Sequence, residues 1–69
     1  MHNRYKGTVI WYDEENGFGI IRIRSSRKTV SIDNTQIHHT TSETIRALHV
    51  GQPVSFQIIN TEARNLYLL

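Results

Sequence analysis

Short runs of β-branched and aromatic residues, separated by turn-forming residues, occupy most of this 69-residue chain. Such runs are typical of β-strands, because these side chains pack well on a pleated surface. The pattern predicts five strands, at residues 5–12, 18–24, 29–33, 53–59 and 66–69. Asn16-Gly17 is the strongest turn feature between them. The length limits the chain to a single domain, expected to span residues 1–69.

Alternation along each predicted strand separates core positions from surface positions. In the third strand, Val30 and Ile32 are expected to face the core, with Ser31 and Asp33 facing outward. In the fourth strand, the core face is expected to carry Val54, Phe56 and Ile58. In the second strand, the core face carries Gly19, Ile21 and Ile23. The opposite face of the second strand then carries, in order, Phe18, Ile20, Arg22 and Arg24.

The connections between the later strands are polar. Thr40-Thr41-Ser42-Glu43 has the form of a helix capping box, which is compatible with a short helix over residues 43–48. Residues 60–65 are expected to form a polar turn. The order of elements predicts an all-β fold, a five-stranded antiparallel Greek-key barrel of the OB kind. An SH3-like barrel is the main alternative.

Several kinds of site have no support in the sequence. The chain has no cysteine, which excludes disulfides and thiolate metal sites. His38 and His39 are adjacent and would point to opposite faces of a strand, so no metal site is expected. No nucleophile elbow or phosphate loop is present, so we expect no catalytic residues and no cofactor. No apolar run approaches the length of a membrane span, which favours a cytoplasmic protein without membrane contact.

Charge is distributed unevenly although the formal net charge is only +2. Four cations lie within seven residues, namely Arg22, Arg24, Arg27 and Lys28. A local basic patch of this kind attracts phosphate groups. A solvated hairpin tip would have the same composition, so charge alone leaves both interpretations open.

Two segments resemble known motifs. Residues 7–12 (GTVIWY), followed by residues 16–21 (NGFGII), resemble the opening of bacterial cold-shock proteins, which runs G-x-V-K-W-F, a short turn, then K-G-F-G-F-I. The spacing from Trp11 to Gly17-Phe18-Gly19 matches that pattern without a gap. Residues 51–56 (GQPVSF) are similar to the family's G-Q-x-V-x-F strand, and residues 30–37 take the place of its second motif, V-F-V-H-F-S-x-I.

The resemblance implies a cold-shock domain that binds single-stranded RNA or DNA, as an RNA chaperone or a regulator of gene expression. Exposed rings would stack on bases while cations meet phosphates. Glycines beside Phe18 would let a base approach closely. The expected nucleic-acid-binding residues are Lys6, Trp11, Tyr12, Phe18, Ile20, Arg22, Arg24, Arg27, Lys28 and His38.

The departures from the family pattern fall on the predicted binding face. Ile20 replaces the second ring of the first motif, and Ser31, Asp33 and Asn34 replace Phe, His and Phe in the second. Because each lost ring removes a stacking contact, binding is expected to be weaker or altered in specificity, and shifted towards the basic hairpin.

Two alternatives remain at this stage. The cold-shock fold could serve protein contact instead, with Ile10, Tyr12 and Ile20 forming an apolar patch. The apolar segment 66–69 could close the barrel, or form an unpaired edge that pairs with a second copy to make a homodimer.

Overall fold

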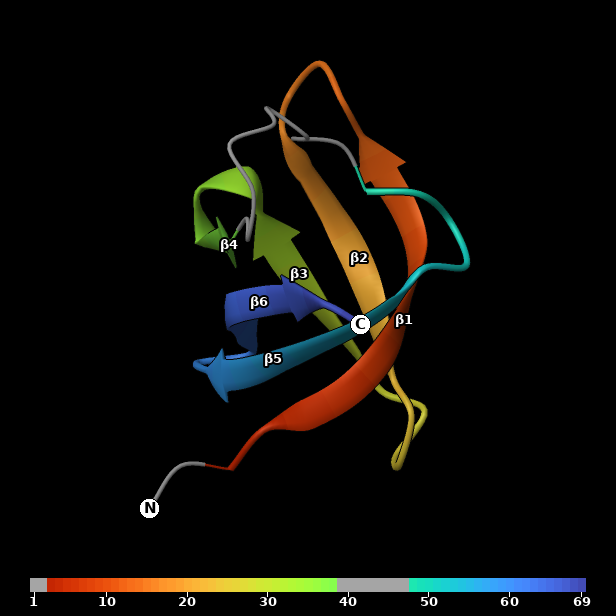
Figure 1. Ribbon diagram of the computed structural model, residues 1–69, viewed down its shortest axis with the longest axis vertical. Helices are drawn as coiled ribbons and strands as arrows, with labels where there is room; N and C mark the ends of the chain where they lie inside the picture. Colours follow the sequence, from red (N-terminus) through yellow and green to blue (C-terminus); the bar gives the residue numbers. More distant parts are fainter. Residues whose placement is uncertain (1–2, 39–47) are drawn as a thin grey trace.

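The chain folds into a small β-barrel, described here for residues 3–38 and 48–69 by a computed structural model (Figure 1). Its elements are β1 (Tyr5–Asp13), β2 (Phe18–Ile23), β3 (Thr29–Asp33), the 3-10 turn η1 (Asn34–Gln36), β4 (Ile37–His38), β5 (Pro53–Ile59) and β6 (Glu62–Leu68). Five strands are long, and β4 has two residues. The predicted five-stranded barrel is confirmed, and the first four predicted strands match β1, β2, β3 and β5 to within one residue.

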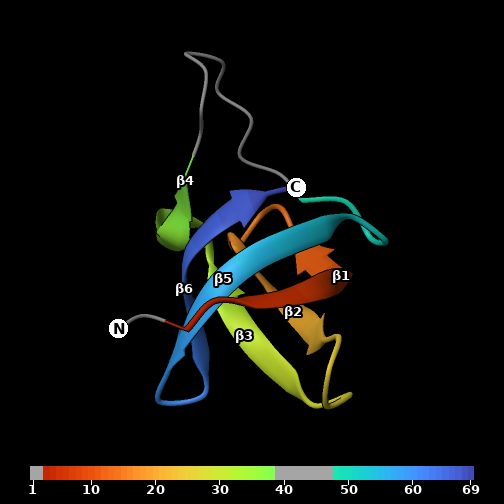
Figure 2. The same ribbon diagram turned by 60° about the horizontal axis from the view of Figure 1, so that its bottom comes forward.

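The strands follow the order β3-β2-β1-β5-β6-β4, and a further pairing of β3 with β6 closes the barrel. Figure 2 shows β3, β2, β1 and β5 side by side around it. The closing pair is parallel, with Ser31 opposite Glu62 and Ile32 opposite Ala63. Strand β6 therefore has β5 on one side and β3 and β4 on the other. The alternative that the C-terminal segment forms an unpaired edge is wrong.

Strand β6 begins at Glu62, four residues earlier than predicted. Asn60 and Thr61 both have positive φ, 52° and 63°, which reverses the chain within two residues. Ala63 of this segment is buried, and Asn65, which has a φ of 52°, is exposed, so the next buried residue is Leu66. The sequence pattern does not predict this half of the strand, because its only apolar side chain is a small alanine.

The segment predicted as a short helix lies mostly outside the described residues. Leu48, its last residue, belongs to no regular element and is buried in the core. The turn η1 occurs earlier, where a polar loop was expected. Its N-cap is Asp33, whose side chain accepts a hydrogen bond from the Thr35 backbone N–H at 2.9 Å.

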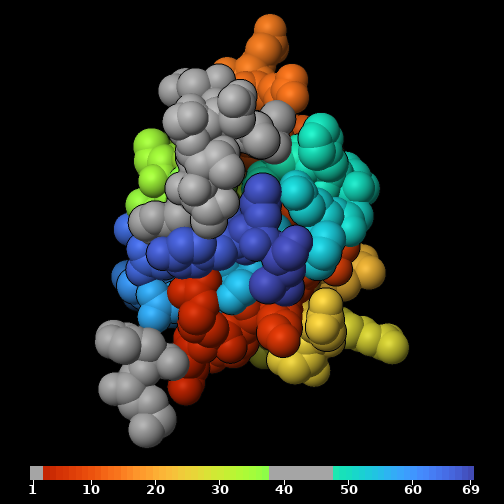
Figure 3. Space-filling view, in the orientation of Figure 1, coloured from red at the N-terminus to blue at the C-terminus, as the bar shows by residue number. Residues whose placement is uncertain are grey.

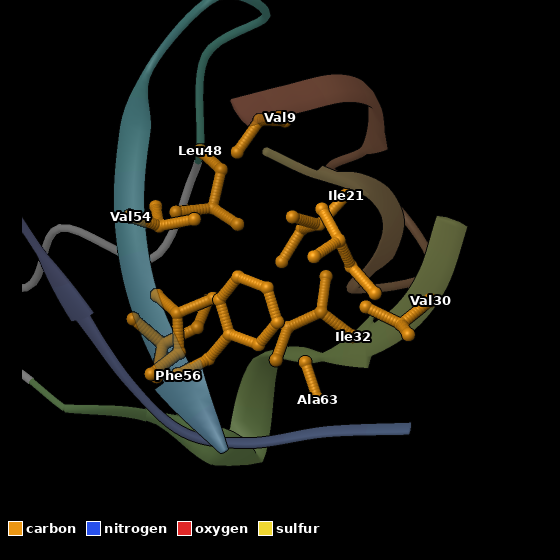
Figure 4. Close-up of a cluster of buried hydrophobic side chains, with 11 residues drawn as sticks. Val9, Ile21, Val30, Ile32, Leu48, Val54, Phe56 and Ala63 are labelled. Atoms are coloured by element: carbon orange, nitrogen blue, oxygen red, sulfur yellow. The ribbon is translucent and has the colours of Figure 1, made fainter. Parts of the chain in front are cut away.

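The core fills the barrel with aliphatic side chains around Phe56. Figure 4 shows the Phe56 ring in the interior, close to Ile32 and Ala63. The buried hydrophobic residues are Val9, Ile21, Ile23, Val30, Ile32, Ile37, Leu48, Val54, Phe56, Ala63 and Leu66. The predicted inward faces of the second, third and fourth strands are confirmed, with Ile58 only partly buried against this core.

A β-bulge interrupts β1 at Ile10. Val9 lies opposite Ile21, but Trp11 lies opposite Ile20, so Ile10 is an extra residue on its strand. Strict alternation would place Trp11 on the same inward face as Val9. Val9 is fully buried while Trp11 is 46% exposed. The bulge therefore turns the Trp11 side chain to the outside of the barrel.

Candidate nucleic-acid interface

Two aromatic rings meet on the outward face of β1 and β2. The centroids of Trp11 and Phe18 lie 5.4 Å apart, and the ring planes are inclined by 67° in an edge-to-face contact. Phe18 is 41% exposed. The partly buried Ile20 lies opposite Trp11 and two residues from Phe18. The result is a compact, solvent-facing apolar platform made of two rings with an aliphatic neighbour.

Tyr12 supports this platform from the inside. It lies opposite Gly19 and packs against the core. A Cβ at Gly19 would come within 2.7 Å of the Tyr12 ring and 2.5 Å of the Trp11 carbonyl oxygen. Burial raises the pKa of the Tyr12 phenol, and the charges of Glu14, Asp33 and Asp13 add to that effect.

The glycines beside Phe18 serve packing and turn formation, so the expectation that they open space for a base is wrong. The space beside Gly19 is filled by Tyr12. Gly17 has a φ of 72°, and a Cβ there would meet the Asn34 side chain. The Asn34 backbone N–H also donates to the Gly17 carbonyl oxygen at 2.8 Å, which ties the first turn to η1.

The expected phosphate-binding cations continue the same face away from the rings. Arg22 lies opposite Thr8 on β1 and Thr29 on β3, and the Arg24 backbone N–H donates to the Lys6 carbonyl oxygen at 2.8 Å. Four residues along β2 separate Phe18 from Arg22, which corresponds to about 13 Å. The exposed cations of this region are Lys6, Arg22, Arg24, Arg27 and Lys28.

The cationic part of the face is hollowed. A shallow depression of about 590 Å³ is lined by Thr8, Arg22, Ile23, Arg24 and Arg27. Figure 3 shows the tip at residues 24–28 (yellow) projecting from the opposite end of the molecule to the turn at residues 14–17 (orange). The acidic run at residues 13–15 (Asp-Glu-Glu) and the basic cluster at residues 22–28 are therefore separated in space as well as in sequence.

The second motif presents polar groups. Ser31 and Asp33 are exposed, and they lie opposite Ile20 and Phe18. Asp33 Oδ1 accepts from the Thr35 backbone N–H at 2.9 Å and from Thr35 Oγ1 at 3.0 Å. These hydrogen bonds lower the pKa of the Asp33 carboxyl, so it is ionised near neutral pH.

Three charged groups on or across β5 and β6 make contacts that the sequence does not predict. Arg4 crosses β5 and β6, donating to Ser55 Oγ and the Ser55 carbonyl oxygen at 2.9 Å, and to the Asn65 carbonyl oxygen at 2.7 Å. Arg64 and Glu62 form an ion pair of 2.9 Å on β6. An arginine in a polar sequence carries no feature that predicts these contacts.

The remaining expectations concern histidines, metals and membranes. The His38 backbone lies in β4 opposite Tyr67, while the His38 side chain and all of His39 fall outside what the structure describes. In the described ranges, no three His, Asp or Glu residues gather as a metal site would require. Nor do these ranges contain a helix with the length and apolar character needed to cross a membrane.

Comparison with known proteins gives the family. The family model for the 'Cold-shock' DNA-binding domain matches residues 5–66. The chain belongs to the cold-shock domain family. Cold shock proteins CapB from Pseudomonas syringae pv. tomato and from Pseudomonas fragi are each 38% identical to it over 58 residues, which is 81% of this chain and 75% of theirs.

A solved structure shares the fold. The cold-shock domain barrel matches drosophila Unr CSD456 with a TM-score of 0.78 and 22% sequence identity. The match covers 99% of this chain but only 27% of the Unr chain. The family and the fold together decide the choice between the OB and SH3-like barrels in favour of the OB kind.

Proposed function

We propose that this cold-shock domain binds single-stranded RNA or DNA across the outward face of β1, β2 and β3. One observation carries the proposal: a half-exposed Trp11–Phe18 pair continues along the same strands into a row of exposed cations. Rings of this kind stack on bases at about 1–3 kcal/mol per base, while arginines and lysines meet the phosphates. The family description as a DNA-binding domain supports the same conclusion.

The proposed roles follow from position. Trp11 and Phe18 stack on two bases, and Ile20 gives an apolar surface beside them. Tyr12 supports Trp11 from the core side. His38 contacts the bound nucleic acid near β4. The phosphate contacts fall to Lys6, Arg22, Arg24, Arg27 and Lys28.

A site with two stacking rings and several cations binds with modest affinity. Its phosphate contacts make the affinity dependent on salt and tolerant of sequence. Those properties suit an RNA chaperone, or a regulator that acts through RNA structure, since both must bind many sequences and release them. The proposed function includes no catalytic step.

Trp11 fluorescence tests the proposal directly. Titration with oligo-dT or oligo-U at low salt is expected to quench it, and Phe18→Leu is expected to weaken binding about tenfold or more, because one stacking ring is lost. Tyr67→Leu is the matched control: it removes another ring of 41% exposure, on β6. It is expected to leave affinity unchanged. Absence of both quenching and a gel mobility shift with the wild-type chain would overturn the proposal.

A role in protein contact has less support. Ile10, Tyr12 and Ile20 are each partly buried, and Tyr12 packs against the core instead of forming an outer apolar patch. Light scattering during size-exclusion chromatography distinguishes the two roles. A dimer that binds no oligonucleotide would favour protein contact.

A further inference from the structure

A hollow lies beside the aromatic pair, where β3 runs between β2 and β6. It encloses about 290 Å³ and opens on the outward face. Phe18 on β2 forms one side, and β6 forms the other. The groups that matter for recognition are Phe18, Ser31, Asp33, Gln36, Glu62 and Arg64. Ser31 and Glu62 are far apart in the sequence, and they meet here because they pair across the barrel closure.

The hollow exists because the side chain on its floor is short. Ser31 lies on β3 between Ile20 of β2 and Glu62 of β6. The cold-shock pattern that this chain resembles carries a phenylalanine at this position. Replacing a ring with a hydroxymethyl group leaves open space next to the exposed Phe18 ring. Loss of the second motif has thus created a cavity as well as removing a stacking surface.

The wall of the hollow offers a fixed acceptor. Asp33 Oδ1 is held by two hydrogen bonds from Thr35. Its other oxygen, Oδ2, has no hydrogen-bond partner within residues 3–38 and 48–69. Hydrogen bonds from the Thr35 backbone and side chain lower the pKa of this carboxyl, desolvation opposes them, and the Arg64 charge lowers it as well. A ligand beside Phe18 therefore meets an ionised, oriented carboxylate.

The nucleobases differ in how they match this acceptor. Cytosine, adenine and guanine carry an exocyclic amine, whose N–H groups donate to a carboxylate. Thymine and uracil have no exocyclic amine, and their one donor on this edge, N3–H, lies between two carbonyl oxygens that repel a carboxylate. The Gln36 amide can donate and accept, so it fits either class. The acceptor on Asp33 is the group that discriminates.

We infer that the hollow between Phe18 and Arg64 is a subsite for one nucleobase bearing an exocyclic amine, with Asp33 as its specificity-determining residue. The base would lie against Phe18 while its amine donates to Asp33 Oδ2. The inference rests on the proposed single-strand binding and adds a base preference to it. Preference for an amine-bearing base over thymine or uracil is expected to be about tenfold, as for a specific carboxylate-to-amine contact.

A pair of isosteric bases tests the inference. Trp11 quenching is titrated with a heptamer of thymidines and with the same heptamer carrying one central 5-methyl-2′-deoxycytidine, called the 5-methylcytidine strand below. These strands differ at one base only by a carbonyl-for-amine exchange and the N3 proton that accompanies it. The 5-methylcytidine strand is expected to bind about tenfold more tightly. Equal affinities would overturn the inference and leave the proposed function standing, whereas no quenching by either strand would overturn both.

Matched variants test whether Asp33 causes the base preference. Asp33→Asn keeps an oxygen to accept from Thr35 but adds an amide donor, so the preference is expected to vanish or reverse. Asp13→Asn is the control, because Asp13 is also a turn-capping carboxylate opposite Phe18 but lies outside the hollow. It is expected to raise affinity for both strands equally. A wild-type preference that survives in Asp33→Asn would overturn the assignment to Asp33.

A second variant tests the hollow without changing the cap of η1. Ser31→Phe fills the space with the ring that the cold-shock pattern carries there. Ser31 is exposed, so the barrel accommodates the ring, and circular dichroism checks the fold. The preference for 5-methylcytidine is expected to disappear while quenching by the thymidine strand remains. A retained preference would overturn the assignment to this hollow.

Discussion

At the scale of single residues, Gly19 links the interior of the barrel to its outward face. A side chain at this position would meet the Trp11 carbonyl oxygen and the Tyr12 ring together. Tyr12 packs against the core, while its neighbour Trp11 is exposed. The absence of a side chain at Gly19 therefore sets the position of both aromatic residues.

Gly19→Ala is expected to lower the free energy of unfolding by about 1–3 kcal/mol, because the added methyl group forces backbone and ring to shift in a packed site. Urea unfolding followed by circular dichroism measures the change. Glu14→Ala, in the exposed turn, is the control and should stay within about 0.5 kcal/mol of the wild type. An unchanged midpoint for Gly19→Ala would show that the site can relax.

At the scale of elements, the hairpin of β2 and β3 carries the basic cluster on a short, hydrogen-bonded tip. The Arg27 N–H donates to the Ile23 carbonyl oxygen at 2.9 Å, and the Ile23 N–H donates to the Lys28 carbonyl oxygen at 2.7 Å. Arg27 has a φ of 64°, which closes the tip. The backbone is fixed while the cationic side chains extend into solvent.

Arg24→Ala is expected to weaken oligo-dT binding at low salt and to reduce the slope of log K against log salt by about 0.7, the value for one phosphate contact on a single strand. Trp11 quenching over a range of salt concentrations measures the slope. Arg24→Lys keeps the charge and should keep the slope. Equal slopes for the alanine variant and the wild type would remove Arg24 from the phosphate contacts.

Element boundaries followed from the sequence where apolar alternation was strong and failed where it was weak. Val30 and Ile32 alternate with polar residues in a clear period of two, and the predicted strand matches β3. The first half of β6 contains one small apolar residue between charged ones, and this pattern predicts a turn. The buried position of Ala63 depends on β3 and β5 beside it, which no local pattern contains.

The candidate site also has one part that local sequence patterns predict and one part that they do not. The resemblance to the cold-shock pattern predicted Trp11 and Phe18 as exposed rings, and the structure shows both exposed on one local hairpin and in contact with each other. The hollow depends on Ser31 and Asp33 of β3 and on Arg64 of β6, and Arg64 reaches the other two only when β6 closes the barrel. Long-range closure of this kind cannot be derived from short-range periodicity. From the sequence, the substitutions at 31 and 33 therefore indicate only the loss of two nucleic-acid-binding side chains.

At the scale of the whole molecule, two carboxylates fix turns at the same end of the barrel. Asp13 Oδ2 accepts from the Asn16 side chain at 2.6 Å, and Asp33 caps η1. Hydrogen bonding lowers both pKa values below the ordinary 3.8, chiefly from the Asn16 side chain for Asp13 and from the Thr35 backbone for Asp33. A lowered folded-state pKa stabilises the fold above the unfolded-state pKa, and that contribution is lost as the pH falls through the folded-state value.

The urea midpoint of the chain is accordingly expected to be constant from neutral pH down to the ordinary carboxyl range and to fall once the pH drops below 3.8. Unfolding curves at a series of pH values measure this. The double variant Asp13→Asn and Asp33→Asn should show a smaller fall, because the titrating groups are gone. An identical pH profile for both proteins would assign the acid sensitivity to other carboxylates.

The bulge at Ile10 shifts the phase of the inward–outward alternation of side chains along β1 by one residue. Before it, the odd-numbered residues Gly7 and Val9 are buried in the barrel; after it, Trp11 points out although its number is odd. The count of residues in this strand matters to the site more than the identity of the extra one. Deleting Ile10 would restore an unbroken alternation, direct the indole towards the core and leave Phe18 without its partner. Many substitutions at Ile10 would keep the phase, whereas the loss of one codon would not.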